Sequence, residues 1–151
     1  MKLKAIVATE EPEHLRRGRI GEQAAKQYLQ SKGLKFLTAN FRSERGEIDL
    51  IFRERCQLPS ASFFTRNETD CLVFVEVKTR SDESWTRPAA AVNARKKRLL
   101  SQTALDYLKL LKHPQVKIRF DIVEVLLKDG EVSDVRHLPN TFSLSAPYRH
   151  G

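Results

Sequence analysis

The chain has 151 residues, of which 27 are Lys or Arg and 19 are Asp or Glu, giving a formal net charge of +8. This length fits one domain, and no apolar run approaches the roughly 20 residues of a membrane helix, which excludes a membrane-spanning protein. The N-terminus offers no apolar stretch of secretory length. The two cysteines, Cys56 and Cys71, match neither a disulfide scaffold nor a zinc pattern. We therefore expect a cytoplasmic protein whose charge favours polyanions, of which nucleic acid is the commonest.

Apolar periodicity predicts helices and strands in an alternating order. The first helix is expected over residues 15–32, and the second begins after Asn93 and ends before Pro114. Residues 53–70 are predicted as a long hairpin loop. Alternation and β-branched content predict strands over residues 35–39, 47–52, 71–79, 116–127 and 131–138, the last pairing back at an edge. This order predicts an α/β or α+β domain with a mixed central sheet flanked by helices, and we take α/β as the fold class.

The strand predicted over residues 71–79 begins with apolar side chains and ends with charged ones. Side chains alternate along a strand, so Leu72, Phe74, Glu76 and Lys78 share one face. Charged groups on a central strand are costly unless they are paired or bound to a metal ion. The pattern therefore indicates a polar site at the end of the strand. An ordinary exposed ion pair on an edge strand is the alternative interpretation.

The preceding strand carries a matching acid. Alternation puts Ile48, Leu50 and Phe52 on one face and Asp49 on the other, and Asp49 lies beside Glu76 if the two strands pair. Two carboxylates at such close range repel each other, and a divalent cation relieves this repulsion. Oxygen ligands from one or two carboxylates are typical of a site for Mg²⁺, and Mn²⁺ is the expected substitute.

Two further residues complete the candidate site. Glu22 borders the buried stripe of the first helix, so it would join the metal ligands Asp49 and Glu76 directly or through water. Lys78 would orient an attacking water or offset the negative charge that develops on phosphate. The combination suggests metal-assisted hydrolysis of a phosphodiester. Taken alone, a residue such as Glu22 is more often a solvated helix acid.

Several blocks of the sequence resemble the YraN-like family of predicted bacterial endonucleases. The longest are residues 45–51 (RGEIDLI), 73–80 (VFVEVKTR) and 119–123 (RFDIV), with shorter blocks at residues 18–22, 40–42 and 96–99. The match runs from Leu15 to Phe142 in consistent order. The family is similar to archaeal Holliday-junction resolvases and belongs to the restriction-endonuclease-like, PD-(D/E)XK group.

This resemblance implies an αβββαβ core, a mixed sheet with a helix on each side, and magnesium-dependent cleavage of nucleic acid. By position, the motif residues would be Asp49, Glu76 and Lys78, with Glu22 as the helix acid. The resemblance places the nuclease-like domain at residues 15–142, with the inserted loop 53–70. An N-terminal extension (1–14) and a C-terminal tail (143–151) would flank it. Resolvases of this group act as dimers, so a homodimer is expected by analogy.

Clusters of basic residues predict where nucleic acid would bind. Four basic residues occupy the first turns of the second helix. Cations at this end oppose the helix dipole, and phosphate binding would explain why they are there. A solvated charge run is the alternative. The predicted contacts are Arg16, Arg17, Arg19, Arg42, Arg45, Arg80, Arg95, Lys96, Lys97 and Arg98. We expect an endonuclease acting on DNA, with branched or structured DNA among its candidate substrates; the alternatives are a ribonuclease and a nucleic-acid-binding module without turnover.

Overall fold

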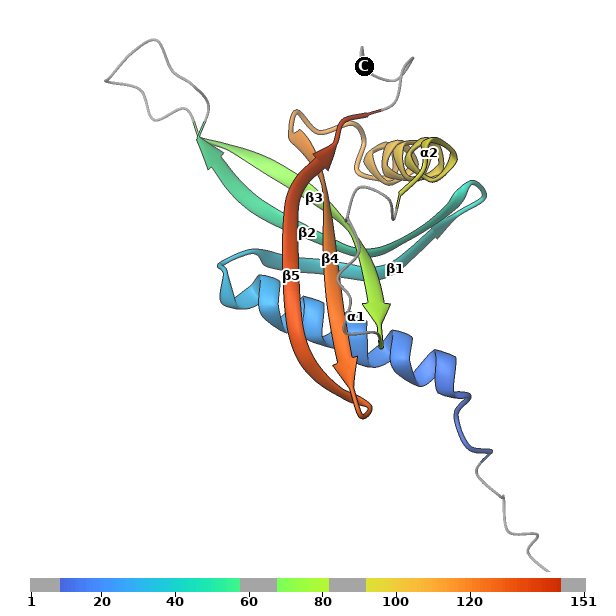
Figure 1. Cartoon of the computed structure of the whole chain (residues 1–151). Helices are drawn as coiled ribbons and strands as arrows, with labels where there is room; N and C mark the ends of the chain where they lie inside the picture. The colour runs from blue at the N-terminus through green and yellow to red at the C-terminus, as the bar shows by residue number, and fades with distance from the viewer. Residues whose placement is uncertain (1–8, 58–67, 82–91, 145–151) are drawn as a thin grey trace, which may run out of the picture.

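The computed structural model describes residues 9–57, 68–81 and 92–144, drawn in colour in Figure 1. Within these residues no helix is long and apolar enough to cross a membrane. The elements follow the chain as α1 (Glu13–Ser31), β1 (Lys35–Ser43), β2 (Gly46–Gln57), β3 (Glu68–Arg80), α2 (Ala94–Leu110), β4 (Lys117–Lys128) and β5 (Glu131–Phe142).

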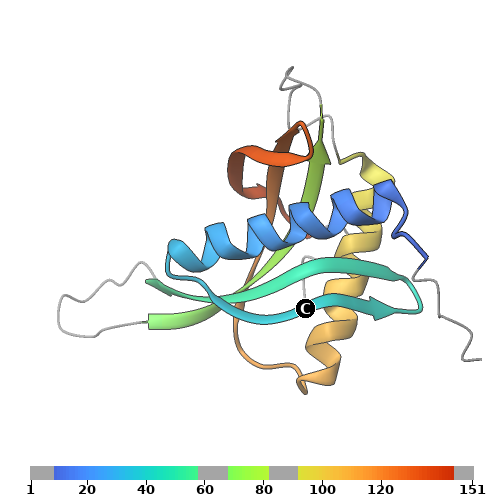
Figure 2. The same ribbon diagram turned by 90° about the horizontal axis from the view of Figure 1, so that it is seen from below.

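The strands form one mixed sheet in the order β1-β2-β3-β4-β5. The pairs β1–β2, β2–β3 and β4–β5 are antiparallel, whereas β3 and β4 are parallel. Parallel neighbours need a crossover connection, and α2 lies in the connection between β3 and β4 (Figure 2). The predicted α/β architecture is confirmed: a mixed sheet with two helices, in an order consistent with a restriction-endonuclease-like core.

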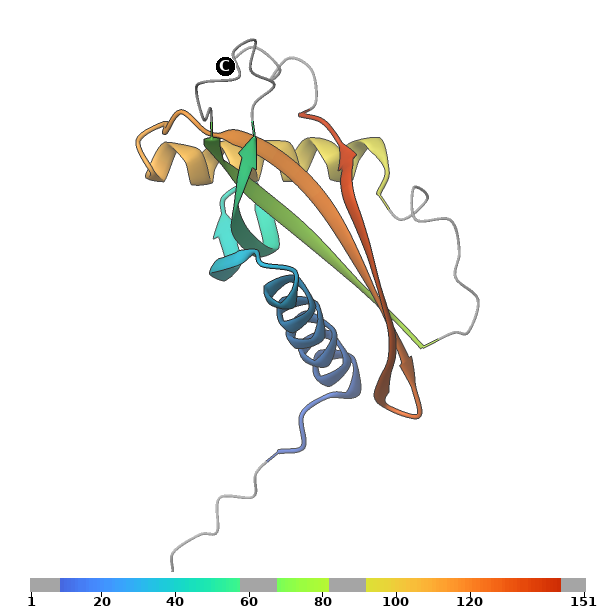
Figure 3. The same ribbon diagram turned by 90° about the vertical axis from the view of Figure 1, so that its left-hand side faces the viewer.

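Each helix packs its apolar stripe against one face of the sheet. Figure 3 shows the two helices beside the strands, running in different directions. Strand alternation divides the core into two clusters, because neighbouring side chains point to opposite faces. The α1-side cluster joins Ala25 and Leu29 to strand residues that include Leu50, Phe52, Val73, Val75, Val123 and Val125. The α2-side cluster joins Leu100 and Ala104 to Ile51, Leu72, Phe74, Phe120 and Ile122.

The second helix begins where the sequence predicts. The side chain of Asn93 accepts a hydrogen bond from the backbone N–H of Lys96 at 2.9 Å, which satisfies one of the free amides of the first turn. The first helix begins at Glu13, two residues before its predicted start, after Pro12. Proline at this boundary is compatible with a helix start because its missing N–H would have no intrahelical partner.

The predicted loop over residues 53–70 is too long, and this interpretation is corrected. Strand β2 continues to Gln57 and β3 already begins at Glu68, with Arg53 opposite Leu72 and Arg55 opposite Asp70. Polar side chains made these strand ends resemble a loop, but an antiparallel ladder tolerates polar residues wherever a face meets water. The rest of the predicted insertion, residues 58–67, lies outside the described residues.

The β1–β2 hairpin changes faces at Asn40, which corrects the predicted alternation around Ile48. Asn40 has a positive φ of 52°, a conformation that Asn tolerates better than most residues. On either side of it, Ala39 pairs with Leu50 in the α1-side cluster, whereas Phe41 pairs with Ile48 in the α2-side cluster. Ile48 is therefore buried beneath α2 rather than beside Leu50, and the hairpin bends where Asp49 stands.

Candidate active site at the divergence of two strands

The candidate catalytic acids lie where β2 and β3 separate. The pairing of these strands ends with Leu50 opposite Val75, so Asp49 and Glu76 occupy the next positions. Beyond this point β2 continues along β1 and β3 continues along β4 (Figure 1). The backbone N–H of Val77 donates to Asp49 Oδ2 at 2.8 Å. We call the place where β2 and β3 separate, at Asp49 and Glu76, the fork. The Asp49 carboxylate accepts a backbone hydrogen bond here in place of the strand-to-strand bond that β2 and β3 no longer make.

Glu76 is held on the α2 side of the fork by two ammonium groups. Its side chain is only 7% exposed, and Glu76 Oε1 lies 3.4 Å from Lys78 Nζ and 3.3 Å from Lys96 Nζ. Burying a carboxylate is costly, and nearby cations offset that cost. Lys78 comes from the same strand face as Glu76, as predicted, whereas Lys96 arrives from the first turn of α2.

Glu22 reaches the fork because α1 lies unusually close to β3. At Gly21 a Cβ atom would come within 1.8 Å of Thr79 Oγ1, so only glycine permits this approach. Burial raises the pKa of Glu22; a hydrogen bond from the Asn40 side chain opposes this, and the charges of Glu47 and Glu76 add to the increase. Glu22 therefore interacts electrostatically with the acids of the fork from the α1 side.

Asp49 has the most strongly shifted pKa of these acids. Burial, and then the charge of Glu76, raise its pKa to about 7; the Val77 amide and Lys96 lower it, whereas the charge of Glu22 raises it further. Part of this increase comes from the negative charges of Glu76 and Glu22, which a further cation at the fork would offset. The fork is therefore a site that a further cation would stabilise.

The donor set of the fork fits a hard divalent cation, with one correction to the predicted ligands. Asp49 and Glu76 offer carboxylate oxygens, the ligand type that Mg²⁺ prefers. Yet over residues 9–57, 68–81 and 92–144 no group of three or more His, Cys, Asp or Glu side chains is close enough to hold a metal ion. In this structure Glu22 is an electrostatic neighbour of the pair, and the predicted three-acid cluster is not assembled. A role for Glu22 through water stays a prediction.

The ten predicted nucleic-acid contacts differ in their surroundings, and one of them, Arg17, is half-buried on α1. Three of the exposed ones, Arg16, Arg95 and Arg98, extend from the helices into solvent. Lys97 lies over the Phe142 ring, with Nζ 5.8 Å from its centroid. Five others lie within ion-pair distance of carboxylates: Arg19 with Glu11, Arg42 with Glu47, Arg45 with Asp106, Arg80 with Glu124, and Lys96 with Glu76. Lys96 is thereby brought into the fork, which the sequence did not predict.

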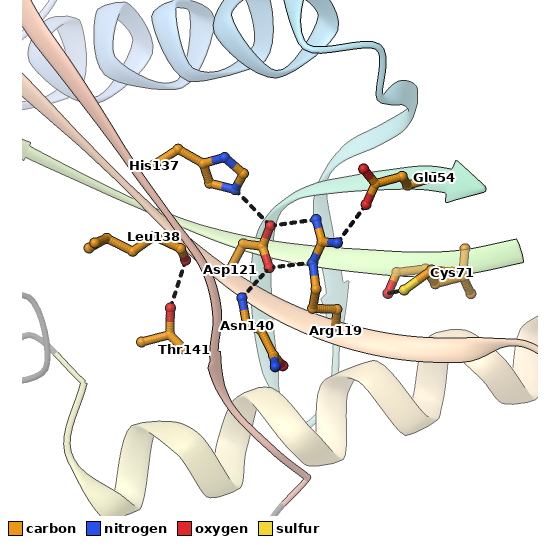
Figure 4. A network of polar contacts seen from close by, with 9 residues as sticks. Glu54, Cys71, Arg119, Asp121, His137, Leu138, Asn140 and Thr141 are labelled. Carbon is orange, nitrogen blue, oxygen red and sulfur yellow. Dashed lines mark hydrogen bonds and ion pairs between the residues drawn. The ribbon is translucent and has the colours of Figure 1, made fainter. Parts of the chain in front are cut away.

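A second polar cluster, on the α1 side of the sheet, was missed by the sequence analysis (Figure 4). Buried Asp121 accepts hydrogen bonds from Arg119 Nε at 2.8 Å and Nη2 at 3.0 Å, and from the Asn140 amide at 2.9 Å; His137 Nε2 lies 2.7 Å away. Arg119 also bonds to Glu54. Burial would raise the pKa of Asp121, but His137, Arg119 and the Asn140 amide outweigh it and lower that pKa. The cluster ties β2, β4 and β5 together.

One buried acid has no hydrogen bond. Both carboxylate oxygens of Glu124 are without a hydrogen-bond partner among the described residues, and its side chain is 0% exposed. Its charge is offset by Arg80 Nη2 at 3.8 Å and by Arg136 Nη1 at 3.6 Å. Glu124 lies directly opposite Lys78 in the β3–β4 register, so the charged row that begins at Glu76 continues across the sheet.

The comparisons with a family model and with individual proteins indicate the same family. The model of the uncharacterised protein family UPF0102 matches residues 21–125. A UPF0102 protein of Trichlorobacter lovleyi is 36% identical over 128 residues, covering 85% of this chain and 91% of the relative. One of Pelobacter propionicus is 34% identical over 138 residues, covering 91% and 90%, and one of Syntrophomonas wolfei is 38% identical over 122 residues, covering 81% and 93%. With Asp49, Glu76 and Lys78 all inside the matched span, the chain belongs to the UPF0102 family, the YraN-like family that its motifs resemble.

Proposed function

We propose that this protein is a metal-dependent endonuclease that hydrolyses phosphodiester bonds in DNA. The observation that carries the proposal is the fork, where buried Glu76 and half-buried Asp49 occupy adjacent positions on neighbouring strands, beside the ammonium group of Lys78. Asp49 is held by a backbone amide and Glu76 by cations, so both carboxylates are fixed before any substrate binds. Such preorganisation is what phosphodiester chemistry requires of a protein, because its transition state is stabilised mainly by placed charges.

Each residue of the fork has a distinct task in this proposal. Asp49 and Glu76 would hold Mg²⁺ or Mn²⁺, with Glu22 contributing through water. When bound, this ion supplies Lewis-acid activation of the scissile phosphate and a lowered pKa of the attacking water. Lys78 would stabilise the negative charge that develops on the phosphate or orient the water. None of these steps needs a nucleophilic side chain.

The basic surface supports nucleic acid as the substrate class. The chain carries a formal net charge of +8, and Arg95 and Arg98 extend from the first turns of the helix whose Lys96 reaches the fork. A phosphate backbone lying along this turn would pass the candidate catalytic groups. Binding through such contacts depends steeply on salt because condensed counterions are released. We therefore expect DNA affinity to fall strongly between low and high ionic strength.

The test is a cleavage assay with purified protein on linear, nicked, flap and four-way-junction DNA, and on matched RNA, in Mg²⁺, Mn²⁺ or EDTA. Asp49→Asn, Glu76→Gln and Lys78→Met are the site variants, and Arg55→Gln, on the exposed end of β2, is a charge-changing control. We expect metal-dependent cleavage of DNA that each site variant reduces by about a hundredfold or more and the control leaves intact.

The other outcomes separate the alternatives. Cleavage that survives all three site substitutions would come from another site and would overturn the proposal. Cleavage confined to RNA would make the protein a ribonuclease acting through the same fork. Salt-sensitive DNA binding without cleavage under every metal condition would favour a nucleic-acid-binding module, in which the two lysines at Glu76 take the place of a metal ion.

A further inference from the structure

Lys96 occupies a position that its place in a basic run does not explain. It lies in the first turn of α2, where the Asn93 cap fixes its backbone through the 2.9 Å hydrogen bond to the Lys96 amide. From there its side chain extends to the sheet, and Lys96 Nζ lies 3.3 Å from Glu76 Oε1. The neighbouring Lys97 instead places its ammonium group over the ring of Phe142. Two adjacent lysines of one helix therefore face different surroundings.

The contact with Glu76 is shared with Lys78. Both ammonium groups lie against the same carboxylate oxygen, at 3.3 and 3.4 Å. A carboxylate oxygen with two ammonium groups within ion-pair distance binds a divalent cation more weakly, because the three positive charges repel one another at this range. The Lys96 side chain is 40% exposed and ends a flexible four-carbon stem, so it can leave Glu76 without unfolding the helix.

We propose that Lys96 is a second catalytic cation of the fork, which neutralises Glu76 in the free protein and binds the reacting phosphate once a divalent cation and the substrate are present. This inference rests on the proposed nuclease function and identifies Lys96 as the cation that acts together with Lys78. Arriving from the helix, Lys96 approaches the fork from above the α2 face, whereas Lys78 rises from the sheet itself. A phosphate between them would meet positive charge from both elements.

The proposal differs from a surface phosphate contact in its consequences. A contact that only anchors the DNA backbone would raise KM when it is removed and leave kcat unchanged. A cation at the reacting phosphate acts in the transition state, so its loss lowers kcat by about a hundredfold. Removal of a charge that competes at Glu76 also has the opposite effect on the metal: Mn²⁺ should bind about fivefold more tightly without DNA.

The experiment compares Lys96→Met, in the full chain, with the control Lys109→Met, which removes an exposed lysine from the last turn of the same helix. Mn²⁺ binding is measured by calorimetry without DNA, and kcat and KM are measured on the best DNA substrate found for the wild type. We expect Lys96→Met to bind Mn²⁺ more tightly yet cleave more slowly, with Lys96→Arg recovering much of the rate. Lys109→Met should change neither Mn²⁺ affinity nor kcat, and far-UV circular dichroism confirms that both variants are folded.

The possible results separate this inference from the function on which it rests. If the wild type binds Mn²⁺ and cleaves DNA while Lys96→Met matches Lys109→Met in both measurements, the role of Lys96 is wrong and the nuclease proposal stands. A rise in KM alone would likewise reduce Lys96 to a backbone contact. If the wild type neither binds Mn²⁺ nor cleaves any nucleic acid, the proposed function fails and the inference fails with it.

Discussion

Replacing Asp49 by Asn should stabilise the metal-free protein at neutral and alkaline pH. The amide retains an oxygen that can accept the 2.8 Å hydrogen bond from the Val77 N–H, while the charge that faces Glu76 and Glu22 is lost. In the folded protein the pKa of Asp49 is raised from its usual 3.8 to about 7, with burial as the main cause. Between these values the folded state binds more protons than the unfolded state, so the stability of the wild type falls as pH rises.

The magnitude follows from the two pKa values. Each pH unit between them costs the wild type about 1.4 kcal/mol of unfolding free energy, and the full interval gives an upper limit of about 4 kcal/mol. We expect the Asn variant to equal the wild type near the lower pKa and to exceed it by about 2–4 kcal/mol above the higher one. Urea denaturation followed by circular dichroism in EDTA, from about pH 4 to about pH 9, measures this difference directly.

Two further arms make the measurement decisive. Asp129→Asn, at an exposed turn where the positive φ of 52° suits Asn, controls for the loss of one negative charge and should keep the pH dependence of the wild type. Mg²⁺ at alkaline pH should raise the stability of the wild type and leave that of Asp49→Asn unchanged, because ligand binding stabilises the folded state that binds it. Parallel pH curves for wild type and Asp49→Asn would refute the electrostatic account of the fork.

Two other substitutions test the close approach of α1 to β3 and the ion pairs of the Asp121 cluster. Gly21→Ala should destabilise the protein by about 1–3 kcal/mol in urea denaturation, because its Cβ would lie 1.8 Å from Thr79 Oγ1, whereas Gly18→Ala, with no atom within 4 Å, should stabilise the same helix by up to about 1 kcal/mol. Asp121→Asn should cost about 1.5–3 kcal/mol near neutral pH because Arg119 loses two hydrogen bonds to a charged group, while its bond to Glu54 remains. The pKa of Asp121 is lowered, so its stabilising effect exists above its unfolded pKa; the cost should therefore shrink in acid, and a pH-independent cost would contradict this assignment.

The sequence was enough to predict the order of the helices and strands, but not the residues at which they end. Apolar alternation identified the core strands because Val73 and Val75, and likewise Phe120 and Ile122, must face the helices. It failed at the ends of β2 and β3, where residues such as Arg55 continue the ladder without burying an apolar side chain. Backbone hydrogen bonds hold these ends, and side-chain pattern does not report them.

The candidate site shows the same division. Alternation placed Glu76 and Lys78 on one face, and strand pairing placed Asp49 beside them, so this part followed from local rules. The ion pair of Lys96 with Glu76 did not, because it depends on where the crossover helix lands on the sheet. For the Asp121 cluster a signal was present: Arg119 and Asp121 are two apart in an apolar strand, and charged residues so placed must pair.

The geometry of the fork is a consequence of how each strand is paired. β2 can turn away from β3 because β1 still satisfies its backbone, and β3 stays straight because β4 satisfies its own. The turn occurs opposite Asn40, whose positive φ bends the hairpin and whose side chain reaches Glu22. One residue thus opens the strands and positions the helix acid. The cation-binding character of the fork is therefore built from the backbone outward, since the parting of the two strands leaves the Val77 amide to donate to Asp49, next to Glu76.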